Sequence, residues 1–279
     1  MTQLGITGAT GTVGGGVAAQ LHQAGLRPRL LVRDPSRAPA WAQDVATASY
    51  GDRDAALKAL TGVDVLLMVS ATESADRLAQ HLTLVDAAAE AGVRHVVYTS
   101  FLGASPTATF TFARTHAATE EHLRASGMTT TMLRDSFYLD FLPDLSVDGV
   151  IAGPAGDGRV AAVAQADVID VAASVLRHLA DGDHRHDNVV YQLTGPQALS
   201  LDEVAEILTA AGRPTVYRPE TVEQAYASRA GYGAPDWEVD GWVTTYTAIA
   251  AGEVSLVTDD VEQVTGHPPQ SLAQLLAAS

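Results

Sequence analysis

Cysteine is absent from this chain of 279 residues. Its absence excludes disulfide scaffolds, thiol nucleophiles, cysteine-ligated zinc and iron–sulfur clusters. Lysine is almost absent as well, since Lys58 is the only one and the remaining strong bases are arginines. A mechanism that requires a lysine must therefore use Lys58 or do without one.

Positive charge is scarce. Lysine and arginine number 17 against 33 aspartate and glutamate residues, which gives a net charge of −16. Such a surface repels phosphate backbones and anionic lipids, so we expect neither nucleic acid nor a membrane as partner. No apolar run approaches the roughly 18 residues of a membrane helix, and the first residues lack the basic patch and apolar stretch of a signal peptide. We therefore expect a cytoplasmic protein.

Apolar residues make up 47% of the chain and charged residues 18%, which suffices for a sizeable core. The first half alternates short apolar runs with longer helical patterns. Strands are expected near residues 4–7, 29–32, 45–48, 63–69, 96–99 and 129–133, and helices near 13–24, 52–60, 75–91 and 110–125. This alternation predicts an α/β fold, a doubly wound parallel sheet with helices on both faces.

The rhythm changes after Arg134. An irregular stretch rich in aromatic residues, glycine and proline leads into a helical tail with proline breaks. We therefore expect two domains, one over residues 1–134 that holds the sheet and a smaller, mostly helical lobe over 135–279. Segments near 160–163 and 189–193 are expected to return to the sheet.

A glycine pattern lies between the first strand and the first helix. In the sequence Gly5-Ile-Thr-Gly8-Ala-Thr-Gly11-Thr-Val-Gly14, the last three glycines form the pattern G-x-x-G-x-x-G. Gly8 would allow the tight turn, Gly11 the approach of the backbone to a pyrophosphate, and Gly14 the close packing of helix on strand. The amides and dipole at the helix start would hold the phosphates. This context between strand and helix predicts that residues 1–134 bind a dinucleotide.

The residues after the second strand indicate which dinucleotide binds. Sites that select NAD place an acid there, to bind the ribose 2′-hydroxyl. This chain has Arg33 directly after the strand and Arg37 four residues later, and two guanidinium groups suit a 2′-phosphate. NADP(H) is therefore predicted, with NADPH preferred over NADH. Asp34 keeps the alternative open, because its carboxylate can bind a 2′-hydroxyl if Arg33 turns outward.

Further cofactor contacts are expected at the carboxyl ends of the strands, where ligands of open parallel sheets lie. The fourth strand is followed by Ser70 and Ala71, the fifth runs into Thr99 and Ser100, and Asp52 follows the third. Turn or helix capping explains Ser70, Ser100 and Asp52 equally well. The predicted cofactor-binding residues are Gly8, Thr10, Gly11, Thr12, Val13, Gly14, Arg33, Arg37, Asp52, Ser70, Ala71, Thr99, Ser100 and His116, the last for the reason given below.

Several stretches resemble the NmrA-like group of atypical short-chain dehydrogenases/reductases, over essentially the whole chain. They include Gly-Ala-Thr-Gly at 8–11, Val-Arg-Asp-Pro at 32–35, the stretch 91–100 and Gly-Asp-Gly-Arg at 156–159. Residues 116–123, and Leu-Arg at 133–134 with Phe-Tyr at 137–138, are most similar to bacterial NAD(P)H:quinone oxidoreductases of type 2. The resemblance implies a Rossmann-type domain, a small C-terminal lobe and a cleft between them.

The chain departs from the wider superfamily at the catalytic positions. Ordinary members carry Tyr-x-x-x-Lys after the fifth strand, where the tyrosine donates a proton and the lysine lowers its pKa and holds the ribose. The matching residues here are Phe112 and His116, and the usual serine falls on Phe101. Lys58 is expected on another helix, so the triad is absent. His116 is then implied to hold the ribose, or to stabilise a phenolate when protonated; a plain packing role is the alternative.

A missing proton donor restricts the substrate. Hydride addition to a simple ketone makes an alkoxide, which must be protonated. Hydride addition to a quinone makes a phenolate, whose conjugate acid has a pKa of about 10, as for tyrosine. The predicted reaction is therefore NADPH-dependent reduction of a quinone or similar conjugated carbonyl compound. Tyr138 is the only phenol near the expected site, so it is a second candidate catalytic residue.

Aromatic residues form the predicted substrate site for a small aromatic or quinone molecule. Phe101, Phe137, Tyr138 and Phe141 would stack on a flat ring, although packing within the lobe explains Phe137, Tyr138 and Phe141 at least as well. The stretch 181–187 holds two histidines, but it is expected as a solvated loop, and no metal site is predicted.

Two other functions remain open. One is a non-catalytic redox sensor of the NmrA type, which binds NAD(P) and acts through a protein partner. The other is a tailoring reductase for polycyclic aromatic quinones. The sequence also leaves open whether the chain forms a homodimer.

Overall fold

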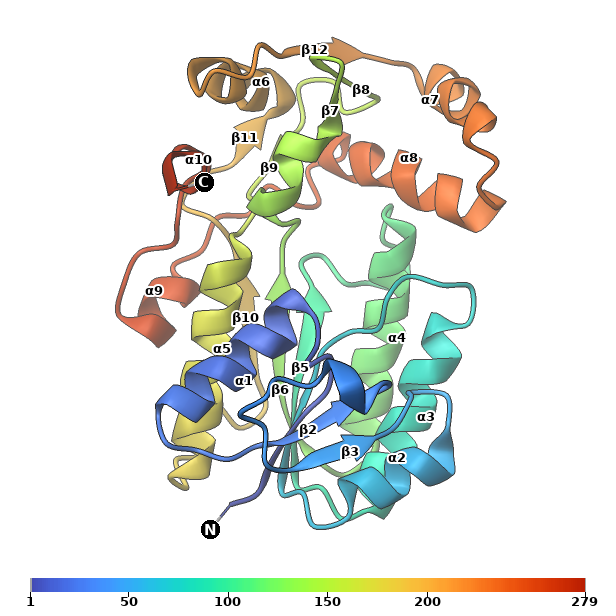
Figure 1. Ribbon diagram of the computed structural model, residues 1–279. Helices are drawn as coiled ribbons and strands as arrows, with labels where there is room; N and C mark the ends of the chain where they lie inside the picture. Colours follow the sequence, from blue (N-terminus) through green and yellow to red (C-terminus); the bar gives the residue numbers. More distant parts are fainter. Residues whose placement is uncertain (1, 279) are drawn as a thin grey trace. The chain divides into compact units, whose positions relative to one another are not determined.

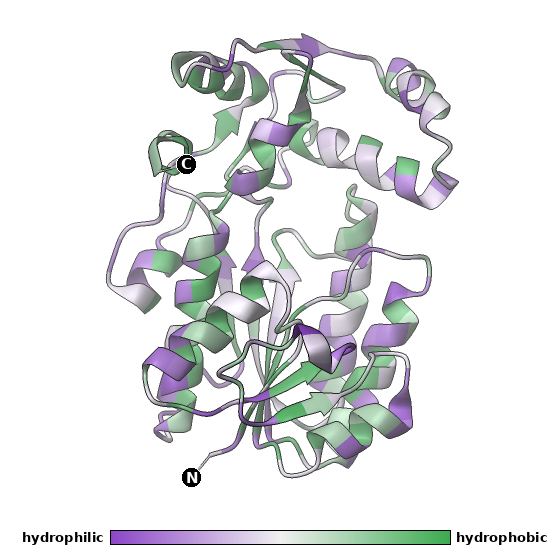
Figure 2. Ribbon diagram, in the orientation of Figure 1, coloured by the Kyte–Doolittle hydropathy of each residue, from purple (hydrophilic) through white to green (hydrophobic). Residues whose placement is uncertain are grey.

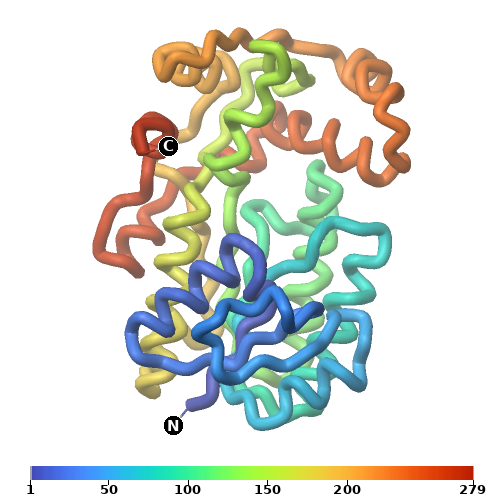
Figure 3. Tube along the Cα trace, viewed as in Figure 1, coloured from blue at the N-terminus to red at the C-terminus, as the bar shows by residue number. Residues whose placement is uncertain are grey.

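The computed structural model describes residues 2–278, which form two compact units. The first unit holds the residues up to Ser100 together with Thr115–Arg134 and Val168–Tyr191. The second holds Phe101–Arg114, Asp135–Asp167 and the residues from Gln192 onward. The predicted boundary at residue 134 coincides with one crossing between the units, but the chain makes several, as the trace in Figure 3 lets the reader follow.

A seven-stranded sheet forms the centre of the first unit, in the order β10-β6-β5-β4-β1-β2-β3 (Figure 1). Its strands are β1 (Leu4–Ile6), β2 (Arg29–Val32), β3 (Val45–Thr47), β4 (Val65–Met68), β5 (His95–Phe101), β6 (Thr129–Asp135) and β10 (Val189–Leu193). The pairs β1–β2, β2–β3, β1–β4 and β4–β5 are parallel. The doubly wound sheet is thus confirmed, and its strand order reverses between β1 and β4, which is where such sheets bind ligands.

Helices cover both faces of this sheet (Figure 1). They are α1 (Thr12–Gln23) and α5 (Gln165–Ala180) on one face, and α2 (Arg53–Leu60), α3 (Arg77–Glu90) and α4 (Thr111–Ala125) on the other. The strands β4 and β5 are buried along their whole length, as strands covered on both sides must be. Figure 2 shows the matching concentration of hydrophobic residues on the central strands.

The second unit has two small sheets and a set of short helices. Its strands are β7 (Ser146–Val147), β8 (Val150–Gly153) and β12 (Val216–Pro219) in one sheet, and β9 (Arg159–Val160) and β11 (Leu199–Ser200) in the other. Its helices are α6 (Leu201–Ala210), α7 (Val222–Arg229), α8 (Asp236–Ala250), α9 (Asp260–Thr265) and α10 (Leu272–Ala278). Short 3-10 helices are η1 (Pro35–Arg37) in the first unit, and η2 (Leu139–Leu145) and η3 (Ala230–Tyr232) in the second. Within residues 2–278, no helix is long and apolar enough to span a bilayer.

The segment at 160–163 differs from its expected place. It was predicted to join the large sheet, but Val160 pairs antiparallel with Leu199, and Val163 makes an isolated parallel bridge to Tyr138. Both contacts lie within the second unit. An apolar run of four residues carries no information on which sheet it joins, since the partner strand decides that.

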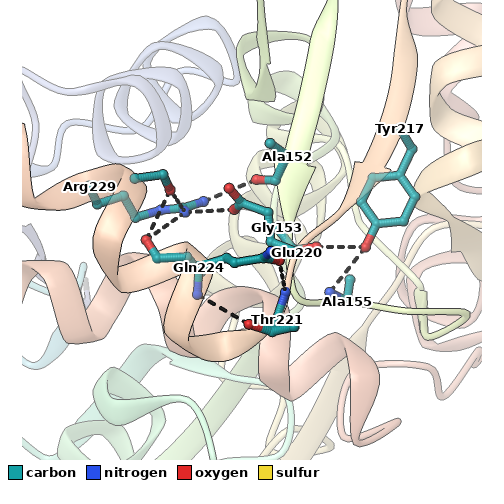
Figure 4. A network of polar contacts seen from close by, with 10 residues as sticks. Ala152, Gly153, Ala155, Tyr217, Glu220, Thr221, Gln224 and Arg229 are labelled. Atoms are coloured by element: carbon teal, nitrogen blue, oxygen red, sulfur yellow. Dashed lines mark hydrogen bonds and ion pairs between the residues drawn. The ribbon is translucent and has the colours of Figure 1, made fainter.

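A partly buried arginine ties the three-stranded sheet of the second unit to its helices (Figure 4). Arg229, on α7, donates to the carboxylate of Glu220 at 3.0 Å and to the carbonyl of Ala152, on β8, at 3.0 Å. Its guanidinium also lies over the ring of Tyr246, 5.3 Å from the centroid. Tyr217 donates to the carbonyl of Gly153 at 2.8 Å, so β8 is held from both sides.

Candidate cofactor site

The loop between β1 and α1 has the geometry that a pyrophosphate requires. Gly8 has a φ of 62°, in the left-handed region, and its carbonyl accepts from the amide of Gly11 at 2.9 Å. A Cβ on Gly14 would lie 2.5 Å from the Gly8 carbonyl oxygen, so only glycine fits there. A Cβ on Gly11 would meet only that oxygen, at 3.4 Å. The backbone above Gly11 is therefore open, and the start of α1 fits phosphate groups.

The other predicted residues of this loop differ in exposure. Gly8, Gly11 and Thr12 are exposed, and Thr10 is half-buried. Val13 is buried in the core of the first unit, so it can offer only its backbone to a ligand.

The two arginines that follow β2 are accessible to a ligand. Arg33 and Arg37 are both exposed. Asp34, which kept the NAD alternative open, caps the short turn that follows: one carboxylate oxygen accepts from the amide of Ser36 at 2.9 Å and from its hydroxyl at 2.7 Å. This engagement of Asp34 favours the arginines as the ribose-binding groups.

Asp52 takes the structural role that was its alternative. Its carboxylate accepts from the amide of Ala55 at 3.0 Å and so caps the N-terminus of α2. No adenine contact is needed to explain the residue.

The end of β4 is held by hydroxyl groups of its neighbours. The amide of Val69 donates to Thr7 at 2.9 Å, and Tyr50 donates to the carbonyl of Val69 at 2.5 Å. The amide of Ser70 donates to the hydroxyl of Thr99, on β5, at 2.8 Å. Thr99 was predicted to contact the cofactor, but it is buried and its hydroxyl holds the loop after β4 instead. Ser70 is half-buried at the edge of the sheet.

Two side chains of α3 hold the next residue, Ala71, at both of its backbone groups. His81 accepts from the amide of Ala71 at 2.9 Å, and Arg77 donates through Nε to its carbonyl at 2.9 Å. Arg77 and His81 lie four residues apart and share one face of the helix. The loop at residues 70–71, for which we predicted cofactor contacts, is therefore held in place by buried side chains.

The hydrogen bonds determine the tautomer of each histidine. Arginine can only donate, so Nε2 of His116, 2.9 Å from Nη2 of Arg77, must be an acceptor. The proton of the neutral ring then lies on Nδ1 and points to the hydroxyl of Tyr98, at 2.9 Å. His81 accepts at Nε2 in the same way, and its Nδ1 donates to Thr119 at 3.0 Å.

This network changes the interpretation of His116. The residue is 5% exposed, and burial, followed by the charge of Arg77, lowers its pKa well below the usual value. A neutral, enclosed imidazole does not fit the expected role of a protonated group that stabilises a phenolate. The geometry gives His116 a positioning role, because it fixes the guanidinium that holds Ala71.

Ser100 is engaged in a second buried network. Its hydroxyl donates to Glu120 at 2.5 Å, and Arg134 binds both oxygens of the same carboxylate at 2.8 and 2.7 Å. Burial alone would raise the pKa of Glu120, but the hydrogen bonds from Arg134 and Ser100 hold it below its usual value. The predicted cofactor contact of Ser100 would require the hydroxyl to leave this carboxylate.

Phe112 is a core residue of the second unit. Its ring contacts Phe110 at 5.6 Å and Trp237 at 6.1 Å between centroids, and a Cβ on Gly241 would lie 2.4 Å from its Cε2 atom. The position that resembles the catalytic tyrosine of the superfamily is thus filled by a packed hydrocarbon ring.

The predicted substrate residues all belong to the second unit but differ in role. Phe101 and Phe137 contact each other with ring centroids 5.0 Å apart and form part of the aromatic core. Phe141 is 49% exposed. Tyr138 is half-buried, and its hydroxyl donates to the carboxylate of Asp135 at 3.0 Å. Asp135 was not among the predicted residues.

Two other features bear on ligand binding. A hollow of about 400 Å³ in the second unit contains none of the predicted residues; it is lined by Pro143, Asp144, Ser146, Gly149, Leu208, Arg213, Pro214 and Thr215. Among residues 2–278, no group of three or more acidic or histidine side chains is arranged to hold a metal ion.

Comparisons with known proteins agree with this geometry. A family described as NAD(P)H-binding matches residues 8–179. The chain is 33% identical to quinone oxidoreductase 2 of Escherichia coli, over 97% of this chain and 96% of that protein. It is 32% identical to an NAD(P)H azoreductase of Xenophilus azovorans, over 98% and 96%.

Solved structures give the same result. The fold matches an NADPH-dependent quinone oxidoreductase of Escherichia coli, solved with NADPH, with a TM-score of 0.89 and 31% identity over 99% of both chains. A triphenylmethane reductase of Citrobacter sp. matches with a TM-score of 0.86 and 29% identity, over 99% of this chain and 98% of the other. The predicted Rossmann-type fold and the predicted NAD(P) cofactor are therefore confirmed, and the chain belongs to the NAD(P)H-binding family, in the NmrA-like group of atypical short-chain dehydrogenases/reductases.

Proposed function

We propose that this protein is an NADPH-dependent oxidoreductase that reduces a quinone or a similar conjugated carbonyl compound. The observation that carries the proposal is the packing of Phe112, because a hydrocarbon ring stands where the superfamily places its proton donor. Such a site suits an acceptor whose reduced form is already a stable anion, and a phenolate meets this requirement. The similar proteins named above, a quinone oxidoreductase, an azoreductase and a triphenylmethane reductase, support the same class of reaction.

The residues of the first unit bind and orient the cofactor in this proposal. The amides at the start of α1 bind the pyrophosphate, and Arg33 and Arg37 bind the 2′-phosphate. Ser70 and Ala71 line the sheet edge, held in place by Arg77 and the ring of His116. When bound, NADPH supplies the hydride.

The residues of the second unit contact the substrate. Phe137, Tyr138 and Phe141 follow β6 directly in the chain and offer aromatic surface to a flat ring. Phe101 supports Phe137 from the end of β5.

The test is steady-state oxidation of NADPH and of NADH by the purified protein, with 1,4-benzoquinone, a naphthoquinone and a simple aliphatic ketone. We expect turnover of the quinones with NADPH, weaker activity with NADH, and little reduction of the ketone. Rapid ketone reduction would contradict the argument from Phe112. Tight NADPH binding without any quinone turnover would favour the redox sensor, which the named activities of the relatives do not support.

A further inference from the structure

Asp135 is the last residue of β6, and its carboxyl group is buried without a full set of partners. The residue is 3% exposed. One oxygen, Oδ2, accepts from the hydroxyl of Tyr138 at 3.0 Å, while Oδ1 has no hydrogen-bond partner among the described residues. The neighbouring hydroxyl of Ser136 is also buried without one. An ionised carboxylate is unstable in such a place, because its charge needs hydrogen bonds or a cation that the surroundings do not supply.

The segments around Asp135 carry no compensating charge. Its carbonyl accepts from the amide of Leu102, beyond β5, and the amide of Ser136 donates to the carbonyl of Leu193, on β10. The segment 160–164, which pairs with residues 137–139, is entirely apolar. Arg134 precedes Asp135 but is bound to Glu120. Burial raises the pKa of Asp135 to about 8, and within residues 2–278 Tyr138 is the one titratable group that influences this pKa, through its hydrogen bond.

We infer that Asp135 and Tyr138 form an internal proton relay, in which a neutral carboxylic acid recharges the tyrosine that protonates the reduced product. This inference rests on the proposed function. It assigns a proton source to a site that lacks the usual triad, and it extends the substrate class to alkylated quinones, whose reduced anions are the more basic.

The geometry defines the direction of the relay. Asp135 is enclosed, whereas Tyr138 is half-buried, so a proton stored on the acid reaches the surface of the second unit through the phenol. For transfer the phenol O–H rotates from Oδ2 towards the quinone, and the protonated Oδ2 then donates to the phenol oxygen. The acid proton passes to the phenol oxygen while the phenol proton passes to the oxygen of the quinone. One hydride from NADPH and one proton convert the quinone to the hydroquinone, and Asp135 is left as a carboxylate that regains its proton from water. Asp135 is a positioning and supply residue, since only Tyr138 touches the product.

The kinetic test compares wild type with Asp135→Asn, with Tyr138→Phe and with Asp144→Asn, an exposed control on η2. NADPH-dependent reduction of tetramethyl-1,4-benzoquinone is measured from pH 6.5 to 9.5, in water and in deuterium oxide. Wild type and the control should lose kcat above about pH 8, where the acid ionises. Both Asp135→Asn and Tyr138→Phe should lower kcat at least tenfold at pH 7 and remove this inflection. The loss should be smaller for unsubstituted benzoquinone, whose reduced anion is less basic.

A spectroscopic readout needs no turnover. Infrared difference spectra of the NADP-bound protein should contain a protonated carboxyl band that disappears above about pH 8 and is missing in Asp135→Asn. In Tyr138→Phe the band should persist to higher pH, because the phenol's hydrogen bond, which lowers the pKa, is gone. Absence of the band, or an unchanged pH profile in Asp135→Asn, would overturn the relay while leaving quinone reduction intact. Absence of quinone turnover in wild type would overturn the proposed function and the relay together.

Discussion

Arg77 donates from Nη2 to Nε2 of His116 at 2.9 Å, across 39 residues of chain. His116 stands at the position that resembles the lysine of the superfamily, so this chain has a neutral ring where its relatives in the wider superfamily have a cation. The cation comes instead from α3 and binds the carbonyl of Ala71. The charge therefore orders the loop after β4.

Replacing His116 with alanine tests this positioning role. The change leaves part of the Arg77 guanidinium buried without its acceptor, so we expect the free energy of unfolding to fall by about 3 kcal/mol. The KM for NADPH should rise more than kcat falls, because the loop that holds the cofactor loosens. Denaturant unfolding and steady-state kinetics provide the measurement, with His122→Ala, a partly exposed position on the same helix, as control. A loss of kcat beyond about a thousandfold, with NADPH binding intact, would mean that His116 takes part in the chemistry.

Two glycine substitutions in the loop between β1 and α1 should separate cofactor binding from folding. Gly11→Val places its side chain in the open space above the loop, so the fold should survive while NADPH binding is lost. Gly14→Ala forces a Cβ to within 2.5 Å of the Gly8 carbonyl oxygen, so it should damage the fold itself. Thermal melting and cofactor titration separate the two effects. Normal NADPH affinity in folded Gly11→Val would show that the phosphates bind elsewhere.

Arg33→Ala should weaken binding of NADPH by about ten- to a hundredfold and leave NADH almost unchanged. The reason is the loss of a charge-assisted hydrogen bond to the 2′-phosphate, which contributes about 1.5–3 kcal/mol. Fluorescence titration of wild type and variant with both cofactors measures the two affinities. Arg27→Ala, an exposed position just before β2, serves as the surface control. Equal affinity of wild type for NADPH and NADH would refute the predicted preference.

Local patterns in the sequence predicted the frame of the first unit well. The glycines at 8, 11 and 14 are read from one short stretch, because their role depends on the backbone of that stretch alone. The hydrogen bonds from Ser36 to Asp34 and from Ala55 to Asp52 can also be predicted from neighbouring residues. Asp–x–Ser and an acid before a helix are local hydrogen-bond patterns.

Contacts between residues far apart in the sequence could not be predicted. Nothing around Arg77 indicates that it meets His116, because the contact exists only once α3 and α4 pack beside β5. Arg134 and Asp135 are neighbours in β6, and successive side chains of a strand point to opposite faces of the sheet. Arg134 therefore reaches the carboxylate of Glu120, whereas Asp135 lies in an apolar region. A sequence shows two charged neighbours, whereas the fold makes one of them a neutral acid.

Phe112→Tyr restores the residue type of the superfamily without restoring its environment. The added hydroxyl would enter the aromatic core beside Trp237 and close to Gly241, so we expect a destabilisation of about 1–3 kcal/mol from overpacking. Quinone turnover should change less than about threefold, because the hydroxyl gains no access to substrate. Melting temperature and kcat with benzoquinone are the two measurements. A tenfold gain in activity would place residue 112 at the reacting atoms and contradict its assignment to the core.

The raised pKa of Asp135 predicts how stability depends on pH. Its ordinary value is 3.8, and in the folded protein burial raises the pKa to about 8, so the folded state binds this proton more tightly than the unfolded state. The stabilisation from this proton is complete below about pH 4 and is lost as the pH rises towards 8. Between pH 6 and 8 the free energy of unfolding should fall by about 2–3 kcal/mol, at about 1.4 kcal/mol for each pH unit.

The variant Asp135→Asn tests this expectation. Asparagine cannot ionise, so the variant should lack this part of the slope. Relative to its own value at pH 6, its free energy of unfolding at pH 9 should therefore be higher than that of wild type. Urea unfolding at pH 6, 7, 8 and 9 measures the slopes, and Asp144→Asn, whose carboxylate is exposed, should retain that of wild type. Parallel slopes for wild type and Asp135→Asn would mean that the carboxyl is ionised throughout this range.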